Sequence, residues 1–583
     1  MPVNDMSFLF GGAAGQGIES NGAGFSRALA RTGLHVFAVP DYMSRIRGGH
    51  NFYHIRVAGD EILTHRDEVH LLLALDAETV QQHASEVVRD GGVLYDETLQ
   101  VDAEDLRARG LQPFPAPLLE IATAVGGRAV MANVAALGVA AGLVEMDFDA
   151  MAGVIRQGFA RKGEEVVQAN LEVARQAYDL ARERYGADFP WRLRPVEAPR
   201  RMVLNGNESF AMGALLGGCK VVCAYPMTPA TPIIQWFAAH GERYGAIIKH
   251  VEDEIAAINM AIGANFAGVR AMAATSGGGF SLMTEALGLA GMSETPLVVF
   301  LSQRPGPSTG MPTRSAQGDL IFSLFASQDE FPRLVLAPHS HEECFAVGWR
   351  AFNLAEKYQT PVIVLLDHHL SSALRSLPPE YLKMNQVYID RGRFLDWAAL
   401  EAMEEPYLRY RITDDGISPR AVPGHPKAVY SATSDEHRED GHIDSETAEN
   451  RTRMHAKRLR KLRAALADIR LPLLYGPEGA EVTLIGWGST YGAIREAVDR
   501  ANAAGARVNM LHFVDVWPFP SEAVRPLLER AGRTLTVENN AMGQMGLLIR
   551  MMTGRAVDGA ILKWDGRGFT PEEILAGLEK EVR

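Results

Sequence analysis

Cysteine is scarce in this 583-residue chain, which has only Cys219, Cys223 and Cys344. Three thiols cannot build a disulfide framework, and they fall one short of the four thiolates that an iron–sulfur cubane requires. Aromatic residues are also few, at 8%, whereas glycine occurs 56 times. This balance indicates many tight strand-to-helix turns and argues against an all-β sandwich.

Long apolar runs and an excess of positive charge are lacking too. The most apolar window, 129–144, is short and is interrupted by Asn133, and the N-terminus has no basic stretch followed by a long apolar run. The formal net charge is −13, which argues against a general nucleic-acid binder. We expect a soluble cytoplasmic protein with neither a membrane nor a nucleic acid as partner.

The chain is too long for one hydrophobic core, since single cores stop growing at roughly 250–300 residues. Apolar strands alternate with helical stretches in three blocks, so the fold class is α/β with three doubly wound domains. The proline- and arginine-rich segment 187–203 is predicted to link the first two blocks. The expected strands are 6–10, 34–39, 70–75 and 91–96 in the first block, 220–226, 269–275, 295–302, 332–338 and 360–367 in the second, and 481–490, 506–513 and 533–539 in the third.

Residues 380–465 lack this rhythm. A proline-glycine loop is followed by a dense mixed-charge stretch, 434–463, which is typical of an extended connection that becomes a solvated helix.

A glycine turn follows the first strand and includes Gly15 and Gly17. Backbone N–H groups at a helix start can bind an anion, although the spacing matches neither the dinucleotide nor the P-loop pattern. A simple packing turn is the alternative interpretation. Arg45 and Arg47, just before a Gly-Gly pair, favour a phosphate-bearing ligand.

Three loops of the second block each follow a predicted strand. Segment 225–232 contains three prolines and presents Thr228, whose hydroxyl can either donate to a carboxylate or cap a turn. Segment 275–281 is a glycine turn open to a flat or charged ligand. Segment 302–314 presents side chains that suit a carboxylate, namely Arg304, Thr309, Thr313 and Arg314.

Three acids precede a small-residue helix. The helix dipole accounts for Glu252 and Asp253. Glu254 lies nearer the helix and can instead face the interior, where a carboxyl with a shifted pKa suits proton transfer.

Several of these motifs occur in an order that resembles the α subunit of 2-oxoacid:ferredoxin oxidoreductases with a γ domain fused ahead of it. The resemblance covers nearly the whole chain. Pro305 stands where the family loop usually has glycine, which could stiffen the loop but leaves its arginine and threonines in register. The motifs are GGAAGQG, RIRGGH, YPMTPATP, EDEIAA and RPGPSTGMPTRSAQGD, and EHREDGHIDSE also resembles part of the α subunit.

The resemblance implies that the chain has four parts. A γ-type domain on the coenzyme A side spans 1–190, and a pyrimidine-binding thiamine diphosphate domain spans 200–380. An extended linker and charged helix spans 381–470, and a transketolase C-terminal-like domain spans 471–583.

The resemblance also implies the reaction, the interconversion of 2-oxoglutarate, coenzyme A and oxidised ferredoxin with succinyl-CoA, CO2 and reduced ferredoxin. Glu254 would hydrogen-bond the aminopyrimidine of thiamine diphosphate and act as the catalytic residue. Thr228, Arg304 and Thr313 would hold the substrate carboxylate, and Arg314 is a candidate for the distal one. The cofactor-binding residues would be Tyr225, Pro226, Glu254, Ser276, Gly277, Gly15, Gly17, Arg45 and Arg47.

No Gly-Asp-Gly motif for Mg2+ and the diphosphate occurs in the chain. A β subunit is therefore expected to carry Mg2+, the diphosphate site and a [4Fe-4S] cluster, and no metal ligand is assigned here. We expect activity only with that subunit, an (αβ)2 assembly, and ferredoxin as the electron partner.

Several alternatives stay open. The 2-oxoacid could be pyruvate or a branched-chain or aryl acid, and the direction could be oxidative decarboxylation or reductive carboxylation as in a TCA cycle. A non-catalytic subunit that binds coenzyme A or a dinucleotide, and a transketolase-like transferase, are hypotheses of other classes.

Overall fold

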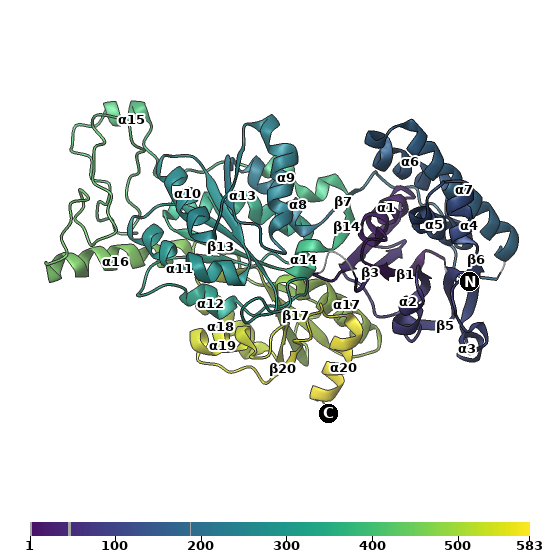
Figure 1. Cartoon of the computed structure of the whole chain (residues 1–583). Helices are drawn as coiled ribbons and strands as arrows, with labels where there is room; N and C mark the ends of the chain where they lie inside the picture. The colour runs from purple at the N-terminus through teal and green to yellow at the C-terminus, as the bar shows by residue number, and fades with distance from the viewer. Residues whose placement is uncertain (1–2, 45–47, 187, 583) are drawn as a thin grey trace. The chain divides into compact units, whose positions relative to one another are not determined.

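The computed structural model describes residues 3–44, 48–186 and 188–582. The chain forms two compact units, each with its own core (Figure 1). We call them the N-terminal unit, Met1–Asn205 with Ser372–Tyr381 and Thr570–Glu573, and the large unit, Gly206–Ser371 with Leu382–Phe569 and Ile574–Arg583. Within the described ranges, no helix has the length and apolar character needed to cross a membrane.

An eight-stranded sheet organises the N-terminal unit, with the order β6-β5-β4-β1-β3-β2-β14-β7. The four strands expected in this block are confirmed, since they overlap β1, β2, β4 and β5 to within one or two residues at most ends. The strands are β1 (Asp5–Ala13), β2 (His35–Asp41), β3 (His50–Ala58), β4 (Val69–Ala74), β5 (Val87–Asp96), β6 (Gln112–Ala116), β7 (Met202–Leu204) and β14 (Leu374–Leu377).

The strand and helix alternation of this block suits a parallel sheet, and β1, β4, β5 and β6 do pair in parallel, but the rest of the sheet is antiparallel. β3 was not predicted, and it pairs antiparallel with both β1 and β2. The connection from Asp41 to His50 is shorter than the dozen or so residues that a parallel crossover needs, so the chain returns as a hairpin.

The apolar window 129–144 forms a helix inside the N-terminal unit. Helix α5 (Ala132–Leu143) packs against α7 (Glu164–Tyr185). A Cβ on Gly138 would lie 2.5 Å from the carbonyl oxygen of Ala174, so the two backbones approach closely only because this residue is glycine. The other helices of the unit include α1 (Ile18–Arg31), α2 (Ala77–His83), α3 (Ala103–Ala108), α4 (Leu118–Ala124) and α6 (Phe148–Phe159).

A seven-stranded sheet organises the first part of the large unit, in the order β18-β12-β13-β11-β10-β8-β9, and all of its pairs except β12–β18 are parallel. The five strands expected here are confirmed. The strands are β8 (Val221–Ala224), β9 (Ile247–His250), β10 (Ala271–Thr275), β11 (Leu297–Gln303), β12 (Leu334–Leu336), β13 (Pro361–Asp367) and β18 (Asp515–Trp517).

A five-stranded sheet, β15-β17-β16-β19-β20, completes the large unit and contains the three strands expected near the C-terminus. Its residues share one core with the seven-stranded sheet, and β18 adds to the edge of the latter. The strands are β15 (Leu473–Tyr475), β16 (Val482–Trp487), β17 (Val508–Phe513), β19 (Arg533–Glu538) and β20 (Gly559–Leu562).

The mixed-charge stretch forms α16 (Ala448–Ala465), preceded by an extended segment with little regular structure (Figure 1). The expectation of a solvated helix is wrong for one face. Lys457 and Lys461 are fully buried there and both pair with Glu294, at 2.5 and 2.6 Å. The charge pattern of the sequence does not show which lysines of the helix are buried. Their acidic partner, Glu294, lies more than 160 residues away in the sequence.

Candidate functional site

Three loops meet where α11 (Gly277–Met292) begins, at the carboxyl edge of the seven-stranded sheet. A Cβ on Gly278 would lie 3.6 Å from Cε of Met227 and 3.9 Å from the carbonyl oxygen of Ser308. The segments after β8 and β11 therefore both reach the first turn of α11. Ligands of open α/β sheets bind at this kind of edge.

Glu254 is the first residue of α10 (Glu254–Phe266), and its side chain is buried, with 4% of the residue exposed. Asp253 caps the helix, because its Oδ1 accepts a hydrogen bond from the Ala256 N–H at 2.7 Å. A Cβ on Gly279 would lie 2.6 Å from both Cγ and Oε1 of Glu254. Within the described chain, no hydrogen-bond partner is found for this carboxylate, so a buried acceptor faces the glycine turn.

Arg304 connects two of the loops. Its Nη1 donates to the carbonyl oxygen of Thr228 at 2.7 Å, and burial lowers the pKa of the guanidinium. Asn207 of α8 (Gly206–Leu216) donates to the carbonyl oxygen of Pro229 at 3.0 Å and so holds the proline loop from its other side. The remaining N–H groups of Arg304 are unpaired among the described residues, and a carboxylate can accept from them.

Asp319 lies beside the start of α11. Its backbone N–H donates to Oε1 of Gln303 at 3.0 Å, and burial raises the pKa of its carboxyl to about 6. A Cβ on Gly277 would lie 2.8 Å from Oδ2 of Asp319. This oxygen and Oγ of Ser276 are both buried and lack partners within the described ranges. The glycine turn is thus surrounded by polar atoms and by N–H groups of the first turn of α11, which have no acceptor within the helix.

The long loop after β11 continues into the five-stranded part of the large unit. Gln317 donates to the carbonyl oxygen of Trp487 at 2.8 Å and accepts from the N–H of Asn539 at 2.9 Å. Thr313 is buried, and Arg314 donates to its carbonyl oxygen at 2.9 Å. The loop is therefore held at its start by the bond of Arg304 to Thr228 and at its end by the bonds of Gln317.

The structure brings most of the predicted residues into one region. Tyr225, Pro226 and Thr228 follow β8, Ser276 and Gly277 open α11, and Arg304, Thr313 and Arg314 lie on the loop after β11. Sequence reasoning assigned no role to Asn207, Gln317 or Asp319. The last two belong to the quoted RPGPSTGMPTRSAQGD motif, which was the available signal.

Gly15 and Gly17 lie in the N-terminal unit. Both have a positive φ, and Gly17 precedes the first residue of α1. Gly15 lines a cavity of about 370 Å³ with Asp96, whose carboxylate accepts from the N–H groups of Thr98 and Leu119. Arg45 and Arg47 lie outside the described residues.

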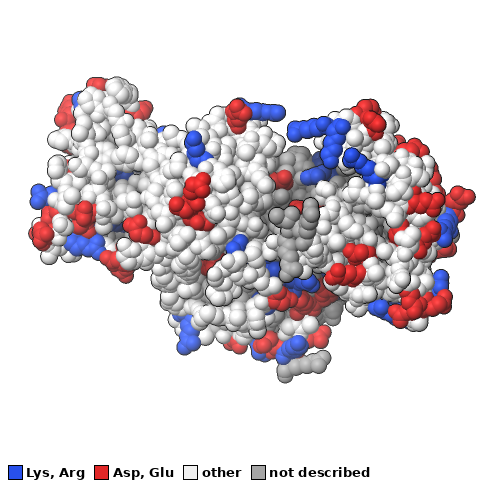
Figure 2. All heavy atoms as spheres, viewed as in Figure 1, with Lys and Arg blue, Asp and Glu red and all other residues white. Residues whose placement is uncertain are grey.

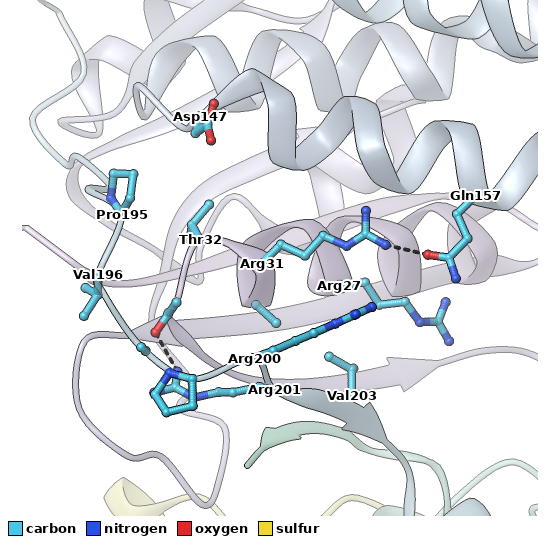
Figure 3. Close-up of a pocket in the computed structure, with 14 residues that line it drawn as sticks. Arg27, Arg31, Thr32, Asp147, Gln157, Pro195, Val196, Arg200, Arg201 and Val203 are labelled. Carbon is cyan, nitrogen blue, oxygen red and sulfur yellow. Dashed lines mark hydrogen bonds between the residues drawn. The ribbon is translucent and has the colours of Figure 1, made fainter. Parts of the chain in front are cut away.

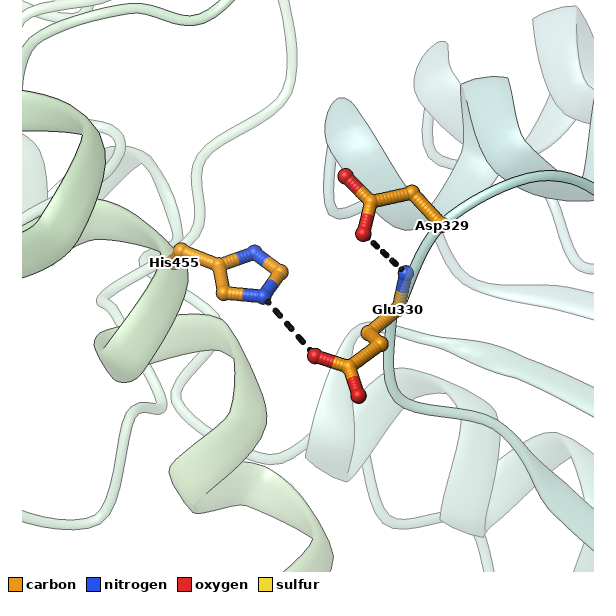
Figure 4. Close-up of side chains that lie close together, drawn as sticks. All are labelled: Asp329, Glu330 and His455. Atoms are coloured by element: carbon orange, nitrogen blue, oxygen red, sulfur yellow. Dashed lines mark hydrogen bonds and ion pairs between the residues drawn. The ribbon is translucent and has the colours of Figure 1, made fainter.

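One group of metal-type side chains lies elsewhere in the large unit (Figure 4). Nε2 of His455 is 3.6 Å from Oε2 of Glu330, and Asp329 pairs with Arg451 at 2.9 Å. Since a guanidinium already neutralises one of the acids, this group is explained as a surface ion-pair network that attaches α16 to the segment before β12.

Family models match three parts of the chain. "Pyruvate ferredoxin/flavodoxin oxidoreductase" matches 7–180, "Pyruvate flavodoxin/ferredoxin oxidoreductase, thiamine diP-bdg" matches 212–457, and "Pyruvate:ferredoxin oxidoreductase core domain II" matches 480–574. A 2-oxoacid:ferredoxin oxidoreductase subunit alpha from Sulfolobus sp is 35% identical over 99% of this chain and 97% of its own length. The chain belongs to the 2-oxoacid:ferredoxin oxidoreductase family.

Two further similar proteins have names that mention 2-oxoglutarate. The 2-oxoglutarate synthase subunit KorA of Methanothermobacter thermautotrophicus is 35% identical over 65% of this chain and 98% of its own length. A solved 2-oxoglutarate:ferredoxin oxidoreductase from Magnetococcus marinus, with 2-oxoglutarate, coenzyme A and succinyl-CoA bound, covers 100% of both chains at 33% identity and a TM-score of 0.92. The predicted family and the α/β fold class are confirmed, and Glu254 lies inside the segment matched by the thiamine diphosphate-binding model.

Proposed function

We propose that this chain is the α subunit, with a fused γ-type domain, of an enzyme that converts 2-oxoglutarate and coenzyme A to succinyl-CoA and CO2 and passes electrons to ferredoxin. The observation that carries the proposal is Glu254, a buried carboxylate without a partner among the described residues, at the glycine turn of the segment matched by the thiamine diphosphate-binding model. The names of two similar proteins support 2-oxoglutarate as the substrate.

The residues at this turn fit thiamine diphosphate. When bound, the cofactor supplies a carbon nucleophile and an electron sink. Glu254 would accept a hydrogen bond from the cofactor's pyrimidine ring, which satisfies the buried acceptor and holds a proton at Oε. Gly279 keeps this carboxylate within reach of α11, because any side chain there would collide with Glu254. Tyr225, Pro226, Ser276 and Gly277 would line the cofactor, and Gly15, Gly17, Arg45 and Arg47 an anionic part of coenzyme A.

The substrate carboxylate would lie between the two loops that Arg304 connects. Its guanidinium donates to one carbonyl oxygen and keeps further N–H groups for the acid, while Thr228 and Thr313 supply hydroxyls. A second carboxylate, as in 2-oxoglutarate, needs a second cation, and Arg314 is the candidate in this chain. Pyruvate is the second candidate substrate, since all three family models bear its name.

The partners follow from what the sequence lacks. Without a Gly-Asp-Gly motif and with three buried cysteines, a β subunit would hold Mg2+, the diphosphate and a [4Fe-4S] cluster. We infer an (αβ)2 assembly and ferredoxin as the acceptor. We further propose that the chain has four functional parts, namely 1–190, 200–380, 381–470 and 471–583.

The test is reduction of a viologen dye by the co-expressed subunits, with 2-oxoglutarate, pyruvate and 2-oxoisovalerate in parallel. We expect reduction with 2-oxoglutarate that depends on coenzyme A, and none by this chain alone. Reduction only with another acid would show that 2-oxoglutarate is not the substrate, but it would support the enzyme class. No reduction with any acid, in a complex shown to contain iron and thiamine diphosphate, would overturn the proposal in favour of a transferase or binding subunit.

A further inference from the structure

A cavity of about 580 Å³ in the N-terminal unit is bordered by four arginines (Figure 3). Arg27 and Arg31 come from the last turns of α1, and Arg200 and Arg201 from the segment that leads into β7. The glycine turn with Gly15 and Gly17 lies at the opposite end of α1. This cavity is therefore separate from the one that Gly15 lines.

Within the described ranges, no acid pairs directly with any of the four arginines, although the charge of Glu61, which pairs with Arg375, also acts on Arg201. Arg27 and Arg200 have no partner in the described part of the chain, Arg31 donates to the amide oxygen of Gln157, and Arg201 donates to the carbonyl oxygen of Gly33 at 2.7 Å. Neither of those two acceptors carries a charge. In addition, Nε of Arg201 is buried without a partner in the described ranges.

The arginines are close enough to repel one another. Burial and then the charges of Arg200 and Arg27 lower the pKa of Arg31. Arg27, Arg31 and Arg200 are exposed, so water solvates them, and an added counter-charge would reduce the repulsion among the four side chains. Basic side chains gather beside α1 and α6 on this face of the molecule, against a net charge of −13 for the chain (Figures 1 and 2).

Few acidic groups lie near enough to supply this counter-charge. Asp147 is the one acid among the residues that line the cavity, and its Oδ1 already accepts from the N–H of Asp149 at the start of α6. Figure 3 draws Asp147 apart from the arginines. Glu197 belongs to the same connecting segment but does not line the cavity.

We propose that this cavity binds a small phosphorylated ligand with two or more phosphate groups. Guanidinium groups pair with phosphate oxygens in a bidentate manner, and four of them match three or four negative charges. The volume falls in the range of small-molecule sites, roughly 300–1,000 Å³, so a nucleotide fits better than a macromolecule. Two sources share this chemistry. One is the 3′-phosphate and diphosphate of coenzyme A, which rests on the proposed function and would move the anionic part of that molecule from the glycine turn to this cavity; the other is a separate nucleotide.

The test is calorimetric titration of the full chain, with whichever subunit it purifies with, in buffers of low and moderate salt. The probes are adenosine 3′,5′-bisphosphate, ADP and inorganic pyrophosphate, each with and without excess coenzyme A. The test variant is Arg31→Gln with Arg200→Gln. The matched control is Arg128→Gln with Arg161→Gln, two exposed arginines of the same unit that do not line the cavity.

We expect at least one probe to bind, and the test variant to weaken it about 10- to 100-fold while the control changes it less than about twofold. Competition by coenzyme A would assign the site to that molecule, and binding without competition would assign it to a separate nucleotide. Absence of binding by all probes, or equal affinity in both variants with unchanged melting temperatures, would overturn the proposal. Because no turnover is measured, that failure would leave the proposed 2-oxoacid chemistry untouched.

Discussion

Nη1 of Arg304 donates to the main-chain carbonyl oxygen of Thr228 at 2.7 Å, so one side chain joins the loop after β11 to the loop after β8. Because the acceptor is a backbone atom, a substitution at Thr228 keeps this contact, whereas a substitution at Arg304 removes it. The position of the proline loop and the proposed carboxylate contact thus depend on the same guanidinium.

The first prediction is that Arg304→Lys lowers kcat/KM for the 2-oxoacid by about 10- to 100-fold, because an ammonium keeps the charge but cannot serve two acceptors in the fork geometry. We expect most of the loss in KM, with the melting temperature nearly unchanged. Steady-state dye reduction by the co-expressed complex measures kcat and KM for the 2-oxoacid. An unaltered KM would show that the acid is held elsewhere.

The second prediction concerns Glu254. Replacing it with Gln keeps the shape but removes the ionisable group, so we expect kcat to fall by about 10²- to 10⁴-fold while thiamine diphosphate still copurifies. Glu252→Gln is the matched control, since Glu252 is exposed two residues away, and it should leave kcat within about twofold. Full activity of the Glu254 variant would remove the residue from the mechanism.

The parallel strands and the loops that follow them could be predicted because each is a local pattern of apolar runs ended by glycine or proline. β3 could not, since its antiparallel pairing depends on the short return from Asp41 to His50 and on neighbours distant in sequence. Glu254 could be singled out as a residue able to face the interior, because its place at a helix start is also local. Asp319 could not, since only the folded chain places it against Gly277.

The third prediction is a pH dependence of stability from Asp319, whose carboxyl pKa burial raises to about 6. The folded state binds this proton more tightly than the unfolded state, in which the pKa is about 3.9. Stability from this group is therefore present at low pH and is lost as pH rises from about 4 to above 6. Ionisation between pH 4.5 and 7.5 should cost about 2 kcal/mol.

Asp319→Asn removes this titration. Its melting temperature relative to the unsubstituted chain should therefore be higher at pH 7.5 than at pH 4.5. Asp329→Asn is the control, because the N–H of Glu330 lowers the pKa of Asp329, which stays ionised over this interval. A difference for Asp319→Asn that does not vary with pH would contradict the assignment.

The fourth prediction concerns the buried group formed by Glu294, Lys457 and Lys461, which attaches α16 to the segment before β11 within the large unit. Glu294→Gln leaves two buried ammonium groups and the buried guanidinium of Arg409 without this counter-charge, and should destabilise the large unit by about 3–5 kcal/mol. Exchanging all three residues together, to Leu, Met and Met, should cost less, because the two lysine charges are then gone and only the guanidinium of Arg409 loses the nearby carboxylate. Arg409 keeps its hydrogen bond to the carbonyl oxygen of residue 294 in both variants. Thermal unfolding followed by circular dichroism checks this, and a triple variant as unstable as the single one would show that the charges themselves stabilise the attachment.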